Sequence, residues 1–240
     1  MQDISWLSRT QLLVGEQKLK TLIHSHVLVV GLGGVGSFAA EFIARAGVGK
    51  MTLVDGDTVD PSNRNRQLPA LSTNHGMLKA DIMEARLKAI NPEIELRIVK
   101  DFMHPEKMLE LLAPRYDYVV DAIDSLMPKL KLLSTAYYNN QRIVSSMGAG
   151  GKLDPTRIRV ADLSQTYQDK LAFYVRKRLR KAHIYSGIKA VFSPEPNVPG
   201  SLMFTDGNNF KRSAFGTISY LPAAFGGVCA SVVLRDLLEM

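Results

Sequence analysis

The sequence predicts an α/β protein with a doubly wound, Rossmann-like and mostly parallel sheet and a C-terminal extension that faces substrate. Short β-branched runs alternate with helix-like stretches over the first 150 of the 240 residues. This alternation is typical of parallel strands joined by right-handed crossover helices. The runs are continuously apolar, as strands buried on both faces should be.

The strands and helices of the first part follow from these runs. Strands are expected at residues 27–30, 51–54, 96–99, 118–120 and 143–144. Helices are expected between them at residues 37–46, 78–90, 105–112 and 128–138. The second helix should end at Asn91-Pro92, because the residue before a proline disfavours the helical conformation.

The pattern changes after Gly148-Ala149-Gly150-Gly151. An extended pair of segments is then predicted at residues 152–162 and a basic helix at residues 168–181. A strand is predicted at residues 188–192. Residues 193–212 are rich in Pro, Gly and Asn and predict a loop long enough to be functional. The apolar run 218–234 predicts a buried terminal helix, in which Pro222 suits the first position.

Composition limits the possible functions. The formal net charge of +7 favours polyanionic partners such as nucleic acid. The single cysteine, Cys229, excludes an internal disulfide framework and a zinc site built from four cysteines. We find no basic-then-apolar leader pattern and no uncharged apolar run of roughly 18 residues, so a cytoplasmic protein without a membrane segment is expected.

A glycine-rich turn between the first strand and the first helix predicts a nucleotide site. Gly31 should make the tight turn. Gly33 and Gly34 should let backbone N–H groups approach phosphate, and Gly36 should let the helix pack closely on the strand. The helix N-terminus adds partial positive charge. Asp55 ends the second strand, where a carboxylate can accept ribose hydroxyls.

The residues that follow indicate which nucleotide is bound. Arg64 and Arg66 follow the second strand, and Lys79 opens the next helix. A triphosphate that loses pyrophosphate needs such cations, because charge develops on the leaving group. Asp124, just past the fourth strand, is suited to hold Mg²⁺ against the phosphates. Three further polar residues are expected in this site: Asp57, Asn63 and Ser125.

These motifs resemble those of the ThiF-type, ubiquitin-activating superfamily, whose members adenylate a carboxylate with ATP. The resemblance implies that Gly31, Gly33, Gly34 and Gly36 form the ATP loop and that Asp55 binds the ribose. It implies that the phosphate ligands are Asn63, Arg66 and Lys79. It also implies that Asp124 is the magnesium-linked acid. Arg9 matches the arginine that such enzymes offer to the ATP of a partner subunit, which implies a homodimer. The expected catalytic residues are therefore Arg9, Arg66, Lys79 and Asp124.

The second half resembles one branch of that superfamily, the tRNA threonylcarbamoyladenosine dehydratases. The resemblance rests on residues 148–156, 161–166, 169–181 and 216–222. Lys170 departs from the branch, which more often has proline there. The branch implies ATP and Mg²⁺, and a tRNA whose threonyl carboxylate is adenylated and then closed into a ring with loss of AMP.

The same resemblance implies how the chain is organised. A single ThiF-type domain is expected over residues 1–240, with residues 1–150 binding ATP and residues 151–240 facing tRNA and the partner subunit. It leaves open whether a monovalent cation and a sulfur-transfer accessory protein take part.

The basic helix is the expected RNA contact. Leu171, Val175 and Leu179 should form its inward stripe. The cations on the rest of its surface suit phosphate binding without sequence preference, and they are Arg176, Lys177, Arg178, Arg180 and Lys181. The sequence leaves open that these charges form only a solvated face.

Three other functions stay open at the level of sequence. One is adenylation of the C-terminus of a ubiquitin-like sulfur-carrier protein, although the zinc cysteines common in such enzymes are missing. Another is an NAD(P)-dependent oxidoreductase, for which Arg66, Lys79 and Asp124 would be coincidental. The last is a nucleotide-sensing RNA-binding module without turnover.

Overall fold

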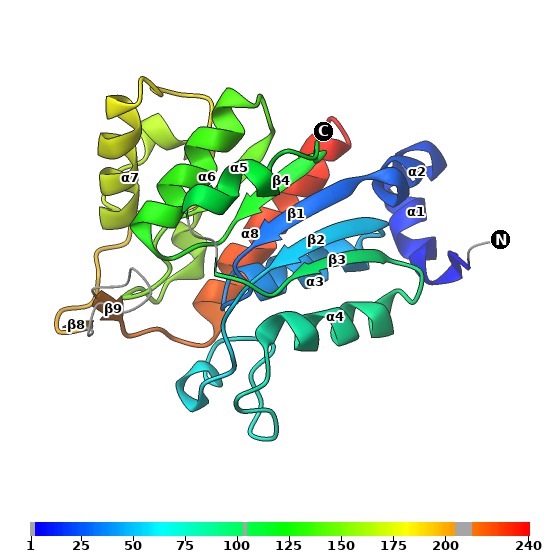
Figure 1. The fold of residues 1–240 in the computed structure, drawn as a ribbon, viewed down its shortest axis with the longest axis horizontal. Helices are drawn as coiled ribbons and strands as arrows, with labels where there is room; N and C mark the ends of the chain where they lie inside the picture. Colours follow the sequence, from blue (N-terminus) through cyan, green and yellow to red (C-terminus); the bar gives the residue numbers. More distant parts are fainter. Residues whose placement is uncertain (1–2, 103–104, 205–212) are drawn as a thin grey trace.

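A seven-stranded sheet forms the centre of the computed structural model, which describes residues 3–102, 105–204 and 213–240 (Figure 1). The strand order is β3-β2-β1-β4-β5-β7-β6, and β6 is antiparallel to β7 while the other pairs are parallel. The strands are β1 (His26–Val30), β2 (Lys50–Val54), β3 (Glu95–Val99), β4 (Tyr118–Asp121), β5 (Ile143–Ser146), β6 (Arg159–Asp162) and β7 (Lys189–Phe192). A separate antiparallel ribbon pairs β8 (Leu202–Phe204) with β9 (Ser213–Phe215).

Helices cover both faces of the sheet (Figure 1). One face packs against α3 (Gly36–Arg45), α4 (Lys79–Ile90) and α8 (Tyr220–Leu237), and the other against α5 (Met108–Leu111), α6 (Leu126–Tyr138) and α7 (Lys170–Lys181). Two further helices, α1 (Ser8–Val14) and α2 (Glu16–His24), lie beside the amino ends of the strands. The predicted doubly wound α/β fold is confirmed.

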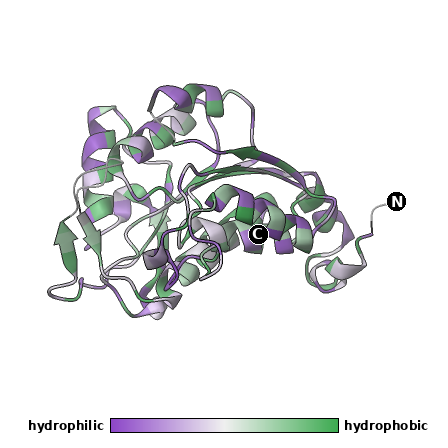
Figure 2. Ribbon diagram, turned by 60° about the horizontal axis from the view of Figure 1, so that its bottom comes forward, coloured by the Kyte–Doolittle hydropathy of each residue, from purple (hydrophilic) through white to green (hydrophobic). Residues whose placement is uncertain are grey.

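The composition of β1 explains why the sheet is buried on both sides. Val27 and Val29 belong to one hydrophobic core, whereas Leu28 and Val30 belong to the other. Successive side chains of a strand point to opposite faces, so a strand covered on both sides must be apolar at every position. Figure 2 shows the green strands of the large sheet between helices that carry purple, hydrophilic residues.

The strand order reverses between β1 and β4, and this reversal positions the site. In open α/β sheets, ligands bind outside the carboxyl ends of the strands at such a point. Backbone hydrogen bonds join the loops there: Gly31 N donates to Val54 O (2.8 Å), and Ala122 N donates to Val30 O (2.9 Å). The glycine loop after β1 therefore lies next to the loop that carries Asp124 after β4.

The first five strands and the major helices lie where the sequence predicts them, but α1 and α2 are not foreseen. None of the α1 side chains is buried in the described part of the protein, and Leu12 and Leu13 are 82% and 83% exposed. A helix without a buried stripe has no amphipathic pattern to detect. Gly15, with φ of 85°, separates α1 from α2.

Two predictions for the second half need correction. Residues 152–162 do not form a pair of extended segments, because Asp154 accepts a hydrogen bond from Thr156 N (2.9 Å) and caps a short 3-10 turn before β6. The predicted loop 193–212 contains β8, which is stabilised by its pairing with β9 rather than by its own pattern. Residues 205–212 of that prediction lie outside the described residues.

The predicted terminal helix is α8, which begins two residues before Pro222. Among the described residues it is the one helix long and apolar enough to cross a membrane. Half of α8 is buried inside the protein, and its buried residues include Phe225 and Cys229, which pack against α3 and the sheet.

A fully buried polar cluster fixes the end of β4. Lys129 Nζ lies 2.6 Å from Asp121 Oδ2 and 3.2 Å from Ser145 Oγ, and both members of the ion pair have no solvent exposure. Ser145 Oγ also donates to Asp121 Oδ2 (2.5 Å), and Ile123 N donates to Asp121 Oδ1 (3.1 Å). The cluster thereby links β4, β5 and α6 directly behind the loop that carries Asp124.

We expect Lys129→Met to lower the free energy of unfolding by about 3–5 kcal/mol, because it leaves the Asp121 carboxylate buried without its countercharge. Urea denaturation followed by circular dichroism measures this loss. Lys50→Met is the matched control: it removes an exposed pair with Glu95 (49% and 71% exposed) and should cost less than about 1 kcal/mol. An equal decrease in the free energy of unfolding for the two variants would contradict the conclusion that Lys129 neutralises a buried carboxylate. Adding Asp121→Asn to Lys129→Met should recover part of the stability.

Candidate active site

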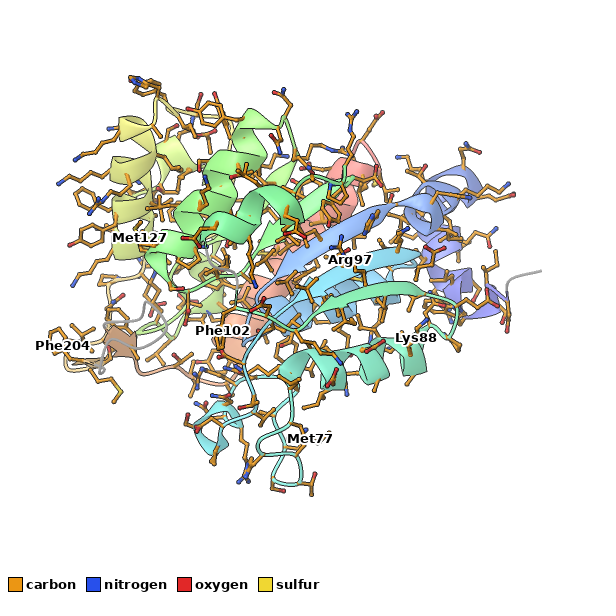
Figure 3. The ribbon with its side chains drawn as sticks, viewed as in Figure 1. Met77, Lys88, Arg97, Phe102, Met127 and Phe204 are labelled. Carbon is orange, nitrogen blue, oxygen red and sulfur yellow. The ribbon has the colours of Figure 1, made fainter. Side chains whose placement is uncertain are left out.

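A cavity of about 830 Å³ opens at the carboxyl edge of the sheet. Its lining brings together ten of the residues that the sequence assigns to a nucleotide site: Gly31, Gly33, Gly34, Asp55, Asp57, Asn63, Arg66, Lys79, Asp124 and Ser125. Phe102, labelled in Figure 3, lies at the same edge and also lines the cavity. The order of strands has therefore gathered residues that are up to 94 positions apart along the chain, from Gly31 to Ser125.

The glycine loop is shaped by backbone contacts that exclude side chains. A Cβ added at Gly36 would lie 1.8 Å from the Gly31 carbonyl oxygen, so the first turn of α3 presses directly on the end of β1. Gly31 itself has φ of 92°, a conformation that L residues rarely adopt. On the other side, Pro222 of α8 packs against Gly34, where an added Cβ would lie 2.9 Å from the proline Cβ. Gly33, Gly34 and Val35 line the cavity at the start of α3, which is the position that phosphate binding by a helix N-terminus requires.

Asp55 ties the glycine loop to the end of β2. Its Oδ2 accepts a hydrogen bond from Leu32 N (2.6 Å), and its Oδ1 accepts one from Asp57 N (2.8 Å). Burial raises the pKa of Asp55, although the nearby Lys79 and these N–H donors act in the opposite direction. Each carboxylate oxygen keeps a second lone pair, so the group can fix the loop and still accept a ribose hydroxyl.

The cations of the site are held by neighbouring polar groups. Lys79 Nζ lies 3.0 Å from Asp57 Oδ2, with the lysine side chain 5% exposed and the aspartate 47% exposed. Arg66 Nη1 donates to Ser62 O (2.9 Å) and Asn65 Oδ1 (2.8 Å). Both cations are therefore preorganised on the cavity wall, which is the condition for stabilising charge that develops during a reaction.

A capped turn carries Asn63 and Arg66, the predicted phosphate ligands after β2. Asp60 caps a short 3-10 helix (Pro61–Asn63), and the Asn63 side chain accepts a hydrogen bond from Asp60 N (3.1 Å). This turn points Asn63 and Arg66 toward the cavity, while Arg64 is exposed and does not line it among the described residues.

Gln67 is a site residue that sequence reasoning missed. It lines the cavity, and its Oε1 is buried without a hydrogen-bond partner among the described residues. A buried acceptor without a donor is costly, so this oxygen suits a donor on a bound ligand, such as a hydroxyl or amino group of a nucleotide. In the sequence, Gln67 could have been recognised as a site residue only from its position next to Arg66 in the polar run after β2.

The cavity extends beyond the predicted nucleotide residues to the second half of the chain. Its outer end is lined by residues of the loop after β5, of α7 and of the ribbon, among them Met147, Gly150, Lys170, Leu171, Tyr174, Leu202, Ala214 and Phe215. The ribbon also carries Phe204, which is 82% exposed and projects from the protein in Figure 3. Periodicity could not place these residues in a site, because three separate segments meet there.

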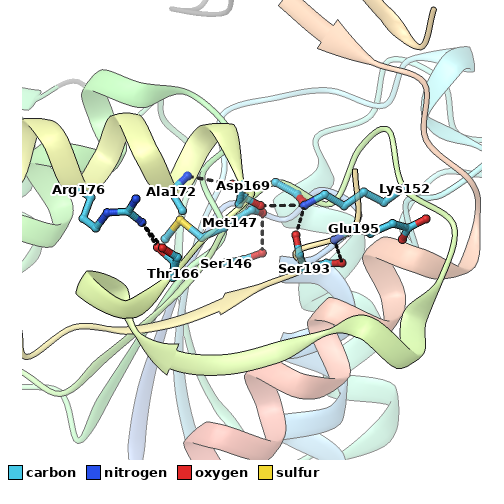
Figure 4. Close-up of polar contacts among 10 residues, drawn as sticks. Ser146, Met147, Lys152, Thr166, Asp169, Ala172, Arg176, Ser193 and Glu195 are labelled. Carbon is cyan, nitrogen blue, oxygen red and sulfur yellow. Dashed lines mark hydrogen bonds and ion pairs between the residues drawn. The ribbon is translucent and has the colours of Figure 1, made fainter. Parts of the chain in front are cut away.

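A buried ion pair joins this outer end to the basic helix (Figure 4). Lys152 Nζ lies 2.9 Å from Asp169 Oδ2, and both side chains are at most 2% exposed. The ammonium also donates to Gly148 O (3.0 Å) and Ser193 O (2.7 Å), so its three protons are all used. Asp169 Oδ1 accepts from Ala172 N (2.9 Å) and caps α7. The start of α7 is thus fixed to the loop after β5.

The basic helix differs in two details from its prediction. Its buried residues are Ala172, Val175 and Leu179, whereas Leu171 is only partly buried at the cavity wall. Arg176 is also partly buried and donates through Nη1 to Thr166 O (2.8 Å), so it supports the preceding segment. The exposed cations of α7 are Lys170, Lys177, Arg178, Arg180 and Lys181.

Arg9 lies on α1, beside the amino ends of the strands (Figure 1). It is exposed and does not line the cavity that the described residues form. Within one chain, Arg9 and the other predicted catalytic residues therefore do not come together.

Metal-binding side chains are sparse in the described part of the protein. No three His, Cys, Asp or Glu side chains there converge in a way that could hold a metal ion. Cys229 is fully buried in α8, and burial raises the pKa of its thiol to about 12. Cys229 therefore acts as a small buried hydrophobe in the core.

Both the sequence and the fold are similar to those of known proteins. The model of the ThiF family matches residues 7–240. The tRNA threonylcarbamoyladenosine dehydratase of Escherichia coli (strain K12) is 39% identical over 98% of this chain and 95% of its own length. The protein of the same name from Bacillus subtilis (strain 168) is 46% identical over 78% of this chain and 74% of its own. The crystal structure of the E. coli enzyme in complex with ATP superposes with a TM-score of 0.89 at 38% identity, covering 97% of this chain and 93% of that one.

We expect Gly36→Ala to lower the free energy of unfolding by about 3 kcal/mol or more, because its Cβ would overlap the Gly31 carbonyl and backbone must shift. Gly227→Ala is the matched control on α8, since its nearest contact would be an ordinary 3.6 Å to the Phe42 ring. Removing a glycine from a helix interior should stabilise that variant by about 0.5–1 kcal/mol. Chemical denaturation of both variants checks the signs. Equal stability of Gly36→Ala and the parent would refute the close packing described here.

Proposed function

This chain belongs to the ThiF family, and we propose that it is an ATP-dependent tRNA threonylcarbamoyladenosine dehydratase. The observation that carries the proposal is a single cavity that begins at the glycine loop, contains Arg66, Lys79 and Asp124, and ends at the basic helix α7. Relatives named for this activity match nearly the whole chain, which supports tRNA rather than a sulfur-carrier protein as the substrate. The E. coli structure in complex with ATP supports ATP as the nucleotide.

In the proposed reaction, the threonyl carboxylate of the modified adenosine attacks the α-phosphorus of ATP and pyrophosphate leaves. The N-terminus of α3 and the glycine loop bind the phosphates through backbone N–H groups. Asp55 accepts the ribose hydroxyls, and Asn63 donates to a phosphate oxygen. Arg66 and Lys79 stabilise the charge that accumulates on pyrophosphate, and Lys79 exchanges its contact with Asp57 for phosphate.

The acyl-adenylate then reacts within the same side chain. An internal nitrogen or oxygen attacks the activated carbonyl, AMP leaves, and the ring closes with net loss of one water. The protein needs no nucleophile of its own, because two groups on one short chain have a high effective concentration. The burial of Cys229 agrees with this route.

Magnesium is part of the proposal. Mg²⁺ is typically held by one or two carboxylates and by substrate phosphates. Asp124 is one of the carboxylates that line the cavity, and it follows β4 next to the glycine loop. The ion would neutralise phosphate charge. Asp124 is held in place by the loop that the buried Lys129–Asp121 pair supports.

The two halves of the chain divide the work in this proposal. Residues 1–150 bind ATP, and residues 151–240 receive tRNA through the exposed cations of α7: Lys170, Lys177, Arg178, Arg180 and Lys181. The excess of positive charge in the whole chain supports a polyanionic substrate. The proposal includes a cytoplasmic location, where tRNA and ATP are found.

We propose further that the enzyme acts as a homodimer in which Arg9 serves the cavity of the partner subunit. Two observations support this arrangement. Arg9 lies away from the cavity of its own chain. The same short helix exposes Leu12 and Leu13, which are 82% and 83% accessible in the single chain and which an interface would cover.

Incubation with ATP and tRNA that carries threonylcarbamoyladenosine should yield a nucleoside lighter by one water, detected by mass spectrometry. Asp124→Asn should reduce this conversion at least about 100-fold, as expected when a group that stabilises the transition state is removed. Pyrophosphate release should require modified tRNA. Equal release with unmodified tRNA would exclude the proposed substrate, and saturable NADH binding without ATP binding would favour an oxidoreductase.

Complementation tests the role of Arg9. Arg9→Ala and Asp124→Ala should each be nearly inactive, because each removes one part of every active site. A mixture that exchanges subunits should regain activity, since a mixed dimer contains one site with Asp124 of one chain and Arg9 of the other. Restored turnover on mixing is the expected result. Activity that stays at the level of the separate variants would show that Arg9 does not act across subunits.

A further inference from the structure

The outer end of the cavity has the walls of an aromatic binding site. Helix α7 contributes Leu171 and Tyr174 to the lining, and the ribbon contributes Leu202 and Phe215. Met147, from the loop after β5, lines the same cavity. These five side chains give the outer end an apolar and aromatic lining, to which Lys170 adds a positive charge. It therefore suits a flat, uncharged group that is attached to a charged chain.

Tyr174 is an aromatic residue of this lining that is available to a ligand. It lines the cavity, yet 52% of its surface is accessible. The Phe173 ring contacts it edge to face, with ring centroids 5.4 Å apart and planes at 74°. Five residues earlier, the buried Asp169–Lys152 pair fixes the first turn of the helix. The ring is thus supported from its own helix while it remains open to the cavity.

The charges around Tyr174 indicate what kind of molecule brings the flat group. Lys170 lies one turn before it and also lines the cavity, and Lys177 and Arg178 follow as exposed cations. Exposed aromatic rings interleaved with cations are the usual surface for single-stranded RNA, because bases stack on the rings while the cations bind phosphates. An apolar protein partner would not require these cations.

We propose that Tyr174 stacks on an unpaired nucleobase of RNA, namely the base that carries the reacting carboxylate. The inference rests on the proposed function, because it places the modified base at the outer end of the cavity that contains Asp124. A base held there would send its side chain along the cavity toward the phosphates near the glycine loop. Phe215 and Leu202 of the ribbon would close over the opposite face of the base.

The test uses three variants and two readouts on the full-length protein. Tyr174→Ala removes the ring, and Tyr174→Phe keeps it. Tyr185→Ala is the matched control, because Tyr185 is 61% exposed near the same basic surface and does not line the cavity among the described residues. The first readout is fluorescence quenching of 2-aminopurine in the loop of an RNA hairpin, which reports stacking without any reaction. The second is KM for modified tRNA and for ATP.

Tyr174→Ala should lose the quenching and raise KM for tRNA about 5- to 100-fold, the effect of losing one stacked base, with KM for ATP unchanged. Tyr174→Phe should retain most of both signals. Quenching and KM that are unaltered in Tyr174→Ala, or equally altered in Tyr185→Ala, would overturn the inference.

The two readouts separate the inference from the proposed function. Turnover of modified tRNA that persists with an unaltered KM in Tyr174→Ala would refute stacking and leave the dehydratase function intact. Quenching that depends on Tyr174 in a protein without turnover would support the stacking site and reject the function.

Discussion

The site depends on one close approach of backbone, that of the first turn of α3 to the end of β1. Gly36 lies so near the Gly31 carbonyl that a Cβ would overlap it. This contact aims the N-terminus of α3 at the cavity, and the hydrogen bond from Leu32 N to Asp55 holds the loop against β2. The other groups to which we assign a function are arranged around this edge: Arg66 on a capped turn, Lys79 at the start of α4, and Asp124 after β4. Phosphate binding by N–H groups requires such a fixed backbone, and the surrounding cations can act only on a phosphate that is held there.

The second half of the chain is attached to this edge by buried charge. Lys152 and Asp169 join the loop after β5 to the start of α7, and the lysine uses its remaining protons on two backbone carbonyls. A buried pair of this kind contributes little net stability but makes misplacement of either partner costly. It therefore serves to define the position of α7 relative to the cavity. In the proposed enzyme, this position sets the distance between the RNA-binding surface and the nucleotide.

The sequence predicted the parts of the structure that repeat or that follow a local rule. Buried strands such as β1 are continuously apolar, and the glycine spacing from Gly31 to Gly36 has a direct geometric reason, so both were predictable. The predicted phosphate-facing residues also line one cavity. Features that depend on tertiary contact were missed. Gln67 matters because its oxygen is buried without a partner, Arg176 turns toward Thr166, and β8 exists only through β9. The exposed helix α1 gave no pattern, since its leucines face away from the core.

Helix α8 has a consequence for the order in which the protein matures on the ribosome. Pro222 packs on Gly34, and Gly226 lies against the Val35 carbonyl, where an added Cβ would be only 2.5 Å from the oxygen. The glycine loop is translated long before α8, because about 190 residues separate Gly34 from Gly226 (226 minus 34 is 192). At a synthesis rate of about 5–20 residues per second, α8 is synthesised roughly 10–40 seconds after the glycine loop on which it packs. A nascent chain should therefore acquire a complete nucleotide pocket only after α8 has left the exit tunnel.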